Sequence, residues 1–318
     1  DFGIDIMCFH SGYTHISTFY DMWAIKSLNI PVIMELHSFF YPIIMEKREV
    51  SGYYASMYQI TDQLVVLSET DKLFWQCLGC QCVYIQNPIE YSMTQTKEIQ
   101  NRTKLKNGKT IVWVGRLVQN PKRVLDVVPI MKRVIKKVPD AKLRLSGLAT
   151  NKKIFSELKQ AIQDNDLSET IEICGYEPDT SRIYREADIL ILTSESESFC
   201  NVILESKVWG VPLVIYELPW LELLKNEKGY VSVESKNTDA MAEKVIELLQ
   251  NEKLRKQLAL EAEESVEDYV KYDVYQAWNK LFEKIYDVGN DIIDEGEQSY
   301  LIIIKKLLSG LYDWHNRI

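Results

Sequence analysis

The sequence predicts an α/β protein with parallel sheets, divided into two domains. Short apolar runs of strand length alternate with stretches of helical periodicity along most of the chain. Alternation of this kind is typical of βαβ units, whose strands pair in parallel. The 318 residues are enough for about two domains of ~150 residues, each with its own core. A polar, apolar-poor segment at 89–109 is typical of an interdomain linker and separates the two halves.

The first domain is expected to begin with strands separated by helices. The strand candidates are apolar runs bounded by polar or turn residues, at 4–9, 31–36, 63–67 and 82–85. Helical patterns lie at 15–28 and 70–78. The chain enters its first strand almost at once and has no initiator Met. We therefore expect a fragment whose first domain is incomplete.

The second domain repeats the alternation. Expected strands lie at 110–114, 142–145, 170–174, 189–192 and 212–215, and expected helices at 123–138, 152–164, 179–186, 201–209, 238–250 and 252–266. Gly115, Gly147 and Gly175 fall where strands end, which lets the backbone approach a ligand closely. We place the domain boundaries at 1–103, 104–271 and 272–318. The last segment holds a helix at 272–286, expected to cross back onto the first domain, and a C-terminal tail.

Composition narrows the class of protein. A net charge of -9 argues against a nucleic-acid binder, which would show a basic stripe. No apolar run reaches ~18 residues, the length of a membrane span, and no signal peptide opens the chain, so a cytoplasmic location is expected. In the tail, 300–314 is a basic and apolar helix candidate. Either it packs on a domain or it contacts the inner face of a membrane peripherally. The oligomeric state is not predicted.

Two metal-site candidates are weak. Cys77, Cys80 and Cys82 cluster, but no second Cys/His pair follows at zinc spacing, so we interpret them as reduced thiols. Asp164 and Asp166 resemble an Asp-x-Asp metal motif, but they fall in a polar helix-to-strand loop rather than at a strand end. We therefore predict neither a metal ion nor a cofactor.

The pair Glu197 and Glu205 is the most informative feature of the second domain. It follows the apolar run 189–192, and a helix is expected to begin near Asn201. Glu197 would then lie at the carboxyl edge of the sheet and Glu205 in the first helical turn, facing the crevice where open α/β sheets bind ligands. The helix N-terminus offers N–H groups for a phosphate, so a nucleotide sugar fits. The alternative is that Glu205 only complements the helix dipole.

Two cations lie at the same predicted edge. Arg116 lies just past the strand 110–114, after Gly115, and Lys122 opens the next helix. Two positive charges there can stabilise a leaving diphosphate without a metal ion. Alternatively, Arg116 pairs with an acidic neighbour and Lys122 is a solvated residue at a helix start.

In this order, these motifs resemble a known family. Gly115-Arg-Leu117 with Lys122, then 139–147, Gly175-Tyr176, the two glutamates and Gly210-Val-Pro212 are similar to the retaining GT-B glycosyltransferases of family 4, the glycogen-synthase-like group 1 transferases. In the first half, the segments around His10, His37, Ser68 and Asn87 resemble that family's amino-terminal domain. The resemblance covers residues 1 to about 286. It implies two Rossmann-like, doubly wound domains that face each other across a cleft.

The resemblance also implies a role for each site residue. Arg116 and Lys122 would hold the donor diphosphate, Glu205 the ribose hydroxyls, and Glu197 the transferred sugar. His37 would reach across the cleft to the anomeric centre, where an imidazole can serve as acid, base or hydrogen-bond donor. The remaining donor-binding residues would be Phe199, Cys200, Asn201 and Val202, whose backbone cups the sugar or phosphate, with Gly115 at the strand end and Gly175 and Tyr176 beside the base.

The expected reaction is metal-independent transfer of a sugar, with retention, from a nucleotide-diphosphate sugar to a hydroxyl of a glycan or lipid-linked acceptor. Glycan or surface polysaccharide synthesis is the expected setting. One departure from the family is Cys200, where a glycine is frequent. The other is the absence of the family's opening strand and Gly-rich loop. Two alternative functions remain. The chain is a nucleotide-sugar 2-epimerase on the same fold, or it is a truncated chain that only binds nucleotide sugar.

Overall fold

A computed structural model describes residues 3–11, 16–41, 51–89 and 108–289. They form two compact units, residues 3–88 with 273–289, and residues 108–272. The expected linker positions 90–107 and the tail 290–318, with its helix candidate at 300–314, lie outside the described residues. Both units are α/β with parallel sheets, which confirms the predicted fold class. No helix in the described part of the chain is long and apolar enough to span a membrane.

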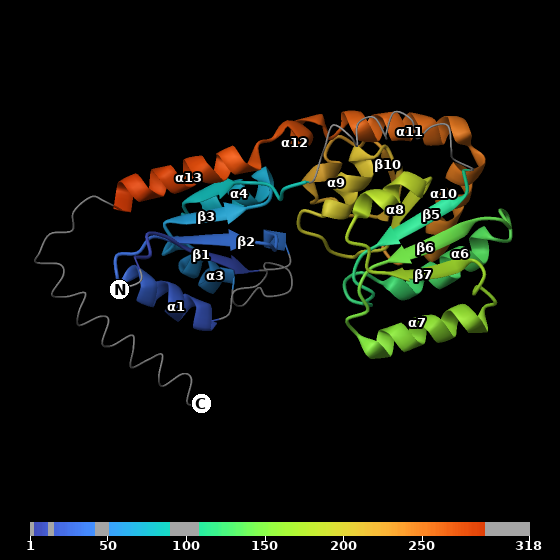
Figure 1. Ribbon diagram of the computed structural model, residues 1–318, viewed down its shortest axis with the longest axis horizontal. Coiled ribbons are helices and arrows are strands. Elements are labelled where there is room, and N and C mark those ends of the chain that lie inside the picture. Colours follow the sequence, from blue (N-terminus) through green and yellow to red (C-terminus); the bar gives the residue numbers. More distant parts are fainter. Residues whose placement is uncertain (1–2, 12–15, 42–50, 90–107, 290–318) are drawn as a thin grey trace, which may run out of the picture. The chain divides into compact units, whose positions relative to one another are not determined.

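The first unit is a four-stranded parallel sheet with its strands in chain order (Figure 1). The strands are β1 (Met7–Ser11), β2 (Val32–Leu36), β3 (Gln63–Val66) and β4 (Cys82–Tyr84), and the helices are α1 (Ile16–Lys26), α3 (Ser51–Gln59), α4 (Glu69–Cys77) and α13 (Val274–Gly289). Every residue of β2 and β3 is buried, because helices cover both faces of a parallel sheet. Helix α13, from the far end of the chain, belongs to this unit.

The second unit contains a six-stranded sheet in the order β10-β9-β8-β5-β6-β7, with every neighbouring pair parallel. The strands are β5 (Thr110–Val114), β6 (Lys142–Ser146), β7 (Ile171–Gly175), β8 (Ile189–Leu192), β9 (Leu213–Tyr216) and β10 (Tyr230–Val233). From β5 the chain adds strands outward to β7, and it then returns beside β5 to begin the other half at β8. Strand order therefore reverses between β5 and β8. In open α/β sheets, ligands bind outside the carboxyl ends of the strands at such a reversal point.

Helices cover both faces of this sheet. They are α6 (Val127–Val134), which follows a 3₁₀ turn η2 (Val124–Asp126), α7 (Lys152–Asp164), α8 (Thr180–Glu186), α9 (Asn201–Val208), α10 (Thr238–Gln250), α11 (Glu252–Glu264) and α12 (Glu267–Lys271), with a second turn η3 (Glu222–Leu224). Ile111 and Trp113 of β5 join the core formed with α6, α7 and α10. Since side chains alternate across a strand, Val112 points to the opposite face. The sheet is doubly wound, as predicted.

Several element boundaries differ from the prediction. Strand β1 begins at Met7 rather than residue 4. The helix expected from residue 123 begins at Val127, because Arg123 has a left-handed backbone (φ 49°) that no α-helix contains. Helices α3 and α12 and strand β10 were not predicted.

Candidate functional site

The carboxyl ends of β5, β6 and β7 in the second unit are in direct backbone contact. Gly115 N–H donates to Ser146 O over 3.0 Å, and Gly147 N–H donates to Gly175 O over 2.7 Å. Gly147 has φ 151°, and a Cβ placed on it would lie 1.7 Å from Gly115 O. A glycine is therefore required at residue 147 because the end of the neighbouring strand β5 lies so close to it. The loops after β5, β6 and β7 are fixed relative to one another by their backbones.

Lys122 and Glu197 meet at the reversal point of the sheet. Lys122 lies in the loop after β5 and Glu197 in the loop after β8, and Lys122 Nζ donates to Glu197 Oε1 over 2.5 Å. Their side chains are only 13% and 10% exposed. The interpretation of Lys122 as a solvated residue is therefore wrong. The sequence had assigned both residues to the donor site from separate motifs, and the structure brings them together.

Buried hydrogen bonds hold these two loops in register. Thr193, directly after β8, accepts a hydrogen bond from Trp113 Nε1 (2.9 Å) and donates one to Lys122 O (2.8 Å). Glu195 N–H donates to Pro121 O over 2.9 Å. These hydrogen bonds therefore link the loop after β5 to the loop after β8 on either side of the Lys122–Glu197 pair. None of these contacts was predicted, because a Trp, a Thr and a Pro far apart in the sequence carry no signal of a shared network.

A second charged network lies beside the pair. The Arg123 guanidinium donates to both carboxylate oxygens of Asp126 (2.8 and 3.1 Å) and lies 3.5 Å from Glu195. Asp126 also accepts from Tyr216 Oη over 2.7 Å in a buried position. Hydrogen bonding to Asp126 raises the pKa of Arg123, so the guanidinium stays charged. Lys236 completes the network with an ion pair of 2.8 Å to Glu195.

Arg116 differs from Lys122 in its surroundings. Its side chain is exposed at the end of β5, and it has no ion-pair partner among the described residues. The alternative in which Arg116 pairs with an acidic neighbour is not observed. An exposed guanidinium two residues past a strand end can bind an anion without first breaking an ion pair.

Glu205 lies one turn deeper in α9 than predicted. Asn201 is the first helical residue, so Glu205 is the fifth, and the first turn of α9 contains no acidic residue. The prediction that Glu205 lies in the first turn was wrong, and the explanation by helix-dipole complementation loses its basis. Instead, Glu205 Oε2 accepts a hydrogen bond of 2.9 Å from the fully buried Tyr184. Burial raises the pKa of Glu205, although hydrogen bonds from Tyr184 and Thr180 oppose the shift.

The start of α9 contains the residues predicted to cup the sugar or phosphate. Phe199 and Cys200 are buried and precede Asn201 and Val202, the first helical residues. Cys200 has a left-handed backbone (φ 62°), the conformation that glycine adopts without strain. Burial raises the pKa of its thiol strongly, so Cys200 is a neutral packing residue rather than a nucleophile.

Tyr176 borders a polar cavity of about 280 Å³ that is lined by residues of β6, β7 and α8, whereas Gly175, predicted beside it, is not a lining residue. Arg144, Glu172 and Glu186 also line the cavity, and the arginine pairs with both glutamates. The ring of Tyr176 is largely exposed and could stack on a planar ligand.

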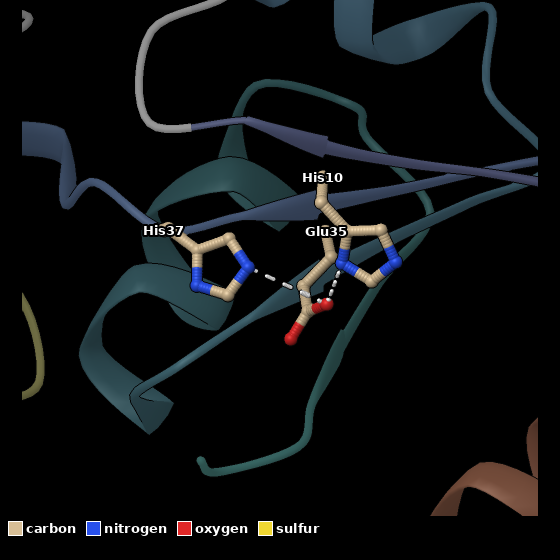
Figure 2. Close-up of side chains that lie close together, drawn as sticks. All are labelled: His10, Glu35 and His37. Atoms are coloured by element: carbon tan, nitrogen blue, oxygen red, sulfur yellow. Dashed lines mark ion pairs between the residues drawn. The ribbon is translucent and has the colours of Figure 1, made fainter. Parts of the chain in front are cut away.

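The predicted His37 lies in a cluster at the carboxyl edge of the first unit (Figure 2). His10 Nδ1 and His37 Nε2 both approach the same oxygen, Oε2, of the buried Glu35, the latter at 3.5 Å. The two imidazole rings are stacked, with centroids 6.0 Å apart. A hydrogen bond with Glu35 raises the pKa of His37. Glu35 was not predicted as a site residue. Its i, i+2 spacing from His37 was the available signal, since it places both on one side of a strand.

The other metal-ligand candidates from the sequence, the aspartates at 164 and 166 and the three clustered cysteines, do not belong to these sites. Within the described ranges, His10, Glu35 and His37 are the one group of three or more potential metal ligands that converge, and Asp164 and Asp166 are not part of such a group. Cys77, Cys80 and Cys82 are free thiols, as expected.

The six-stranded, doubly wound parallel sheet, with the Lys122–Glu197 pair at its reversal point, defines a Rossmann-like α/β protein. Comparison with known families identifies the class of protein more specifically. The family described as "Glycosyl transferases group 1" matches residues 94–265, more than half of the chain. The chain belongs to this family.

Individual relatives are distant. The N-acetyl-alpha-D-glucosaminyl L-malate synthase of Bacillus anthracis is 25% identical over 231 residues, which span 71% of this chain and 58% of the relative. The amylovoran biosynthesis glycosyltransferase AmsD of Erwinia amylovora is 26% identical over 234 residues, 70% of this chain and 63% of the relative. The chain thus spans less than two thirds of these two proteins.

A solved structure confirms the fold. Anabaena HepE in complex with UDP and glucose superposes with a TM-score of 0.67 at 15% identity, over 88% of this chain and 78% of HepE. The predicted GT-B fold is therefore correct.

Proposed function

We propose that the protein transfers a sugar from a nucleotide-diphosphate sugar to a hydroxyl of a glycan or lipid-linked acceptor, with retention of configuration and without a metal ion. The contact between Lys122 and Glu197 at the sheet reversal point, next to the exposed Arg116, carries this proposal. The names of relatives agree with it, since AmsD acts in amylovoran biosynthesis and HepE was crystallised with UDP and glucose. Glycan or surface polysaccharide synthesis is the setting that we propose.

The charges of the crevice suit a leaving diphosphate. Arg116 and Lys122 supply two positive charges where negative charge develops as the bond between the sugar carbon and the phosphate oxygen breaks. Lys122 is paired with Glu197. A diphosphate competes with Glu197 for Lys122, and the released carboxylate can accept hydrogen bonds from the sugar. Donor binding would thereby place Glu197 at the transferred group.

The remaining groups bind the nucleoside and complete the reaction. Glu205, oriented by Tyr184, accepts hydrogen bonds from the ribose, and the exposed Tyr176 ring stacks on the base. For retention, the acceptor oxygen bonds to the sugar carbon on the face that the phosphate leaves. Its proton passes to the departing phosphate oxygen, so this route needs no second carboxylate. We propose that His37 donates a hydrogen bond to the reacting sugar.

Nucleotide-diphosphate binding tests the proposal most directly. Removing the Arg116 guanidinium deletes a charge-assisted contact, so Arg116→Ala should weaken binding of UDP or GDP by about 2–3 kcal/mol in a calorimetric titration. Lys132→Ala is the matched control, because Lys132 on α6 is exposed and its ammonium group hydrogen-bonds to Asn165, away from the loops after β5 and β8. Equal affinity of the wild type and Arg116→Ala would refute the diphosphate site.

Metal independence has a separate test. If Arg116 and Lys122 provide the positive charge, treatment with a chelator should not lower the rate of sugar transfer. The anomeric configuration of the product, read by NMR, tests retention in the same assay. Loss of turnover with chelator and recovery with magnesium or manganese would show that the two cations do not replace a metal ion.

A further inference from the structure

We propose that His10, Glu35 and His37 form a binding site for a divalent transition-metal ion of the zinc type. The potential ligand atoms are Nδ1 of His10, a carboxylate oxygen of Glu35 and Nε2 of His37, and all lie within 4.8 Å of one another. Figure 2 shows both imidazole rings turned toward the one carboxylate. Two imidazoles and a carboxylate are a common ligand set for zinc in proteins.

The fold places these three residues together. His10 is directly opposite Glu35 in the parallel register of β1 and β2. His37 follows β2 immediately, two positions after Glu35, and its N–H donates to Ser11 O over 2.8 Å, so it continues the strand pairing. The side chains of residues two apart leave a strand on the same side. The cluster is therefore set by backbone pairing at the edge of the sheet rather than by mobile surface chains.

The separations fit a small ion after a minor adjustment. Zinc lies ~2.0–2.2 Å from its nitrogen and oxygen ligands, so ligand atoms of one ion are roughly 3.0–3.5 Å apart. The Glu35–His37 pair meets this requirement at 3.5 Å. His10 lies closer to Glu35 and must withdraw slightly, which its 58% exposed side chain can do without moving the sheet.

The three side chains differ in solvent exposure in a way that suits a metal site, with a buried carboxylate and accessible imidazoles. The side chain of Glu35 is 11% exposed and forms the floor, whereas that of His37 is 40% exposed. A bound ion would have three protein ligands and a position open to water or another oxygen ligand.

Occupation of this site has a consequence for the reaction, which rests on the proposed function. A metal ion bound to Nε2 of His37 excludes a proton from that nitrogen and holds the ring, so Nε2 can no longer donate a hydrogen bond to the sugar. Zinc should therefore inhibit transfer, even though transfer itself needs no metal.

The binding test does not depend on activity. The chelator-treated full chain is titrated with Zn²⁺ by calorimetry, and with Co²⁺ while its visible absorption is recorded. We expect one ion per chain. Glu35→Gln, which preserves shape, and His10→Ala, which removes an exposed side chain, should each weaken binding by more than about tenfold, since even the loss of an outer-shell partner costs that much. Asp164→Asn is the control, because Asp164 belongs to no group of converging ligands in the described residues, and it should leave the affinity unchanged. Absence of binding, or equal binding by all variants, would overturn the proposal.

The activity arm separates this site from the proposed function. In transfer assays, the ratio of rates with and without Zn²⁺ should fall in the wild type and stay near unity in His10→Ala. Equal inhibition of both proteins would overturn the inhibitory role. A chain that binds zinc at the cluster but transfers no sugar under any condition would refute the proposed function and leave the metal site standing.

Discussion

Glu197 and Glu205 have different partners although they flank the same helix start. Glu197 faces the cation Lys122, and Glu205 faces the neutral hydroxyl of Tyr184. Neutralising Glu197 frees a lysine that can turn to a phosphate, whereas neutralising Glu205 removes a hydrogen-bond acceptor and frees no cation. The two substitutions should thus act on different parts of a bound donor.

We expect Glu197→Gln to leave the affinity for a nucleoside diphosphate unchanged or to raise it, while sugar transfer falls at least about a hundredfold, as for the loss of an interaction made with the reacting group. Glu205→Gln should weaken the nucleoside diphosphate and the nucleotide sugar to a similar degree, because the ribose is common to both. Calorimetry with both ligands and steady-state kinetics measure these effects. Parallel losses of nucleotide affinity in the two variants would contradict the division.

The ends of β5, β6 and β7 act as one element, because their backbones are in direct contact at Gly115, Gly147 and Gly175. A side chain at residue 147 would strike Gly115 O, and it would have to adopt the φ of 151° found there, which L residues rarely adopt. Gly147→Ala should therefore lower the free energy of unfolding by roughly 2–4 kcal/mol, the combined cost of overpacking and backbone strain. Urea denaturation measures the change. The control is Gly52→Ala in α3, where an added Cβ meets nothing within 4 Å, and stability should stay the same or rise slightly.

Elements with continuous apolar runs were predictable from the sequence. Strands β5 and β8 and helices α7 and α10 have the predicted bounds, because buried parallel strands and amphipathic helices leave clear patterns. Strand β10 was missed since Tyr-Val-Ser-Val is short and half-exposed at the sheet edge. The start of α6 was misplaced because nothing local in the sequence reveals the left-handed backbone of Arg123, which Asp126 and Glu195 hold in place through its side chain.

The candidate site was predictable only in part. Strand-end residues such as Arg116 and Lys122 could be found because parallel sheets bring their carboxyl ends to one edge. The partners that hold the site could not. Tyr184 reaches Glu205 from another helix, and Thr193 joins Trp113 to Lys122 across 80 and 71 positions of sequence. Such pairs depend on tertiary contacts that no local pattern encodes.

For the molecule as a whole, the buried charge of Lys207 lowers the stability of the folded protein. Its ammonium group is fully buried, two residues after Glu205 in α9, and it donates to Leu223 O (2.8 Å) and Ser265 Oγ (3.1 Å). It thereby joins α9 to η3 and to the end of α11, but neither acceptor carries a full charge. Burial lowers the pKa of Lys207 from 10.5 to about 8. The folded protein therefore bears the cost of a charge that water would solvate better in the unfolded chain.

This cost should depend on pH in a definite direction. Below pH about 8 Lys207 is protonated in both states and the penalty is complete. As pH rises from there toward 10.5, the folded protein loses the proton before the unfolded chain does, so the contribution of Lys207 to stability increases. The difference in unfolding free energy between wild type and Lys207→Met should grow in favour of the wild type, by about 3 kcal/mol across this window. Urea denaturation at several pH values measures it, and subtracting the variant removes the titration of other groups. Lys153→Met, with a side chain that is 83% exposed in the wild type, should show no such slope. A constant difference between wild type and Lys207→Met would mean that Lys207 is solvated in the folded protein.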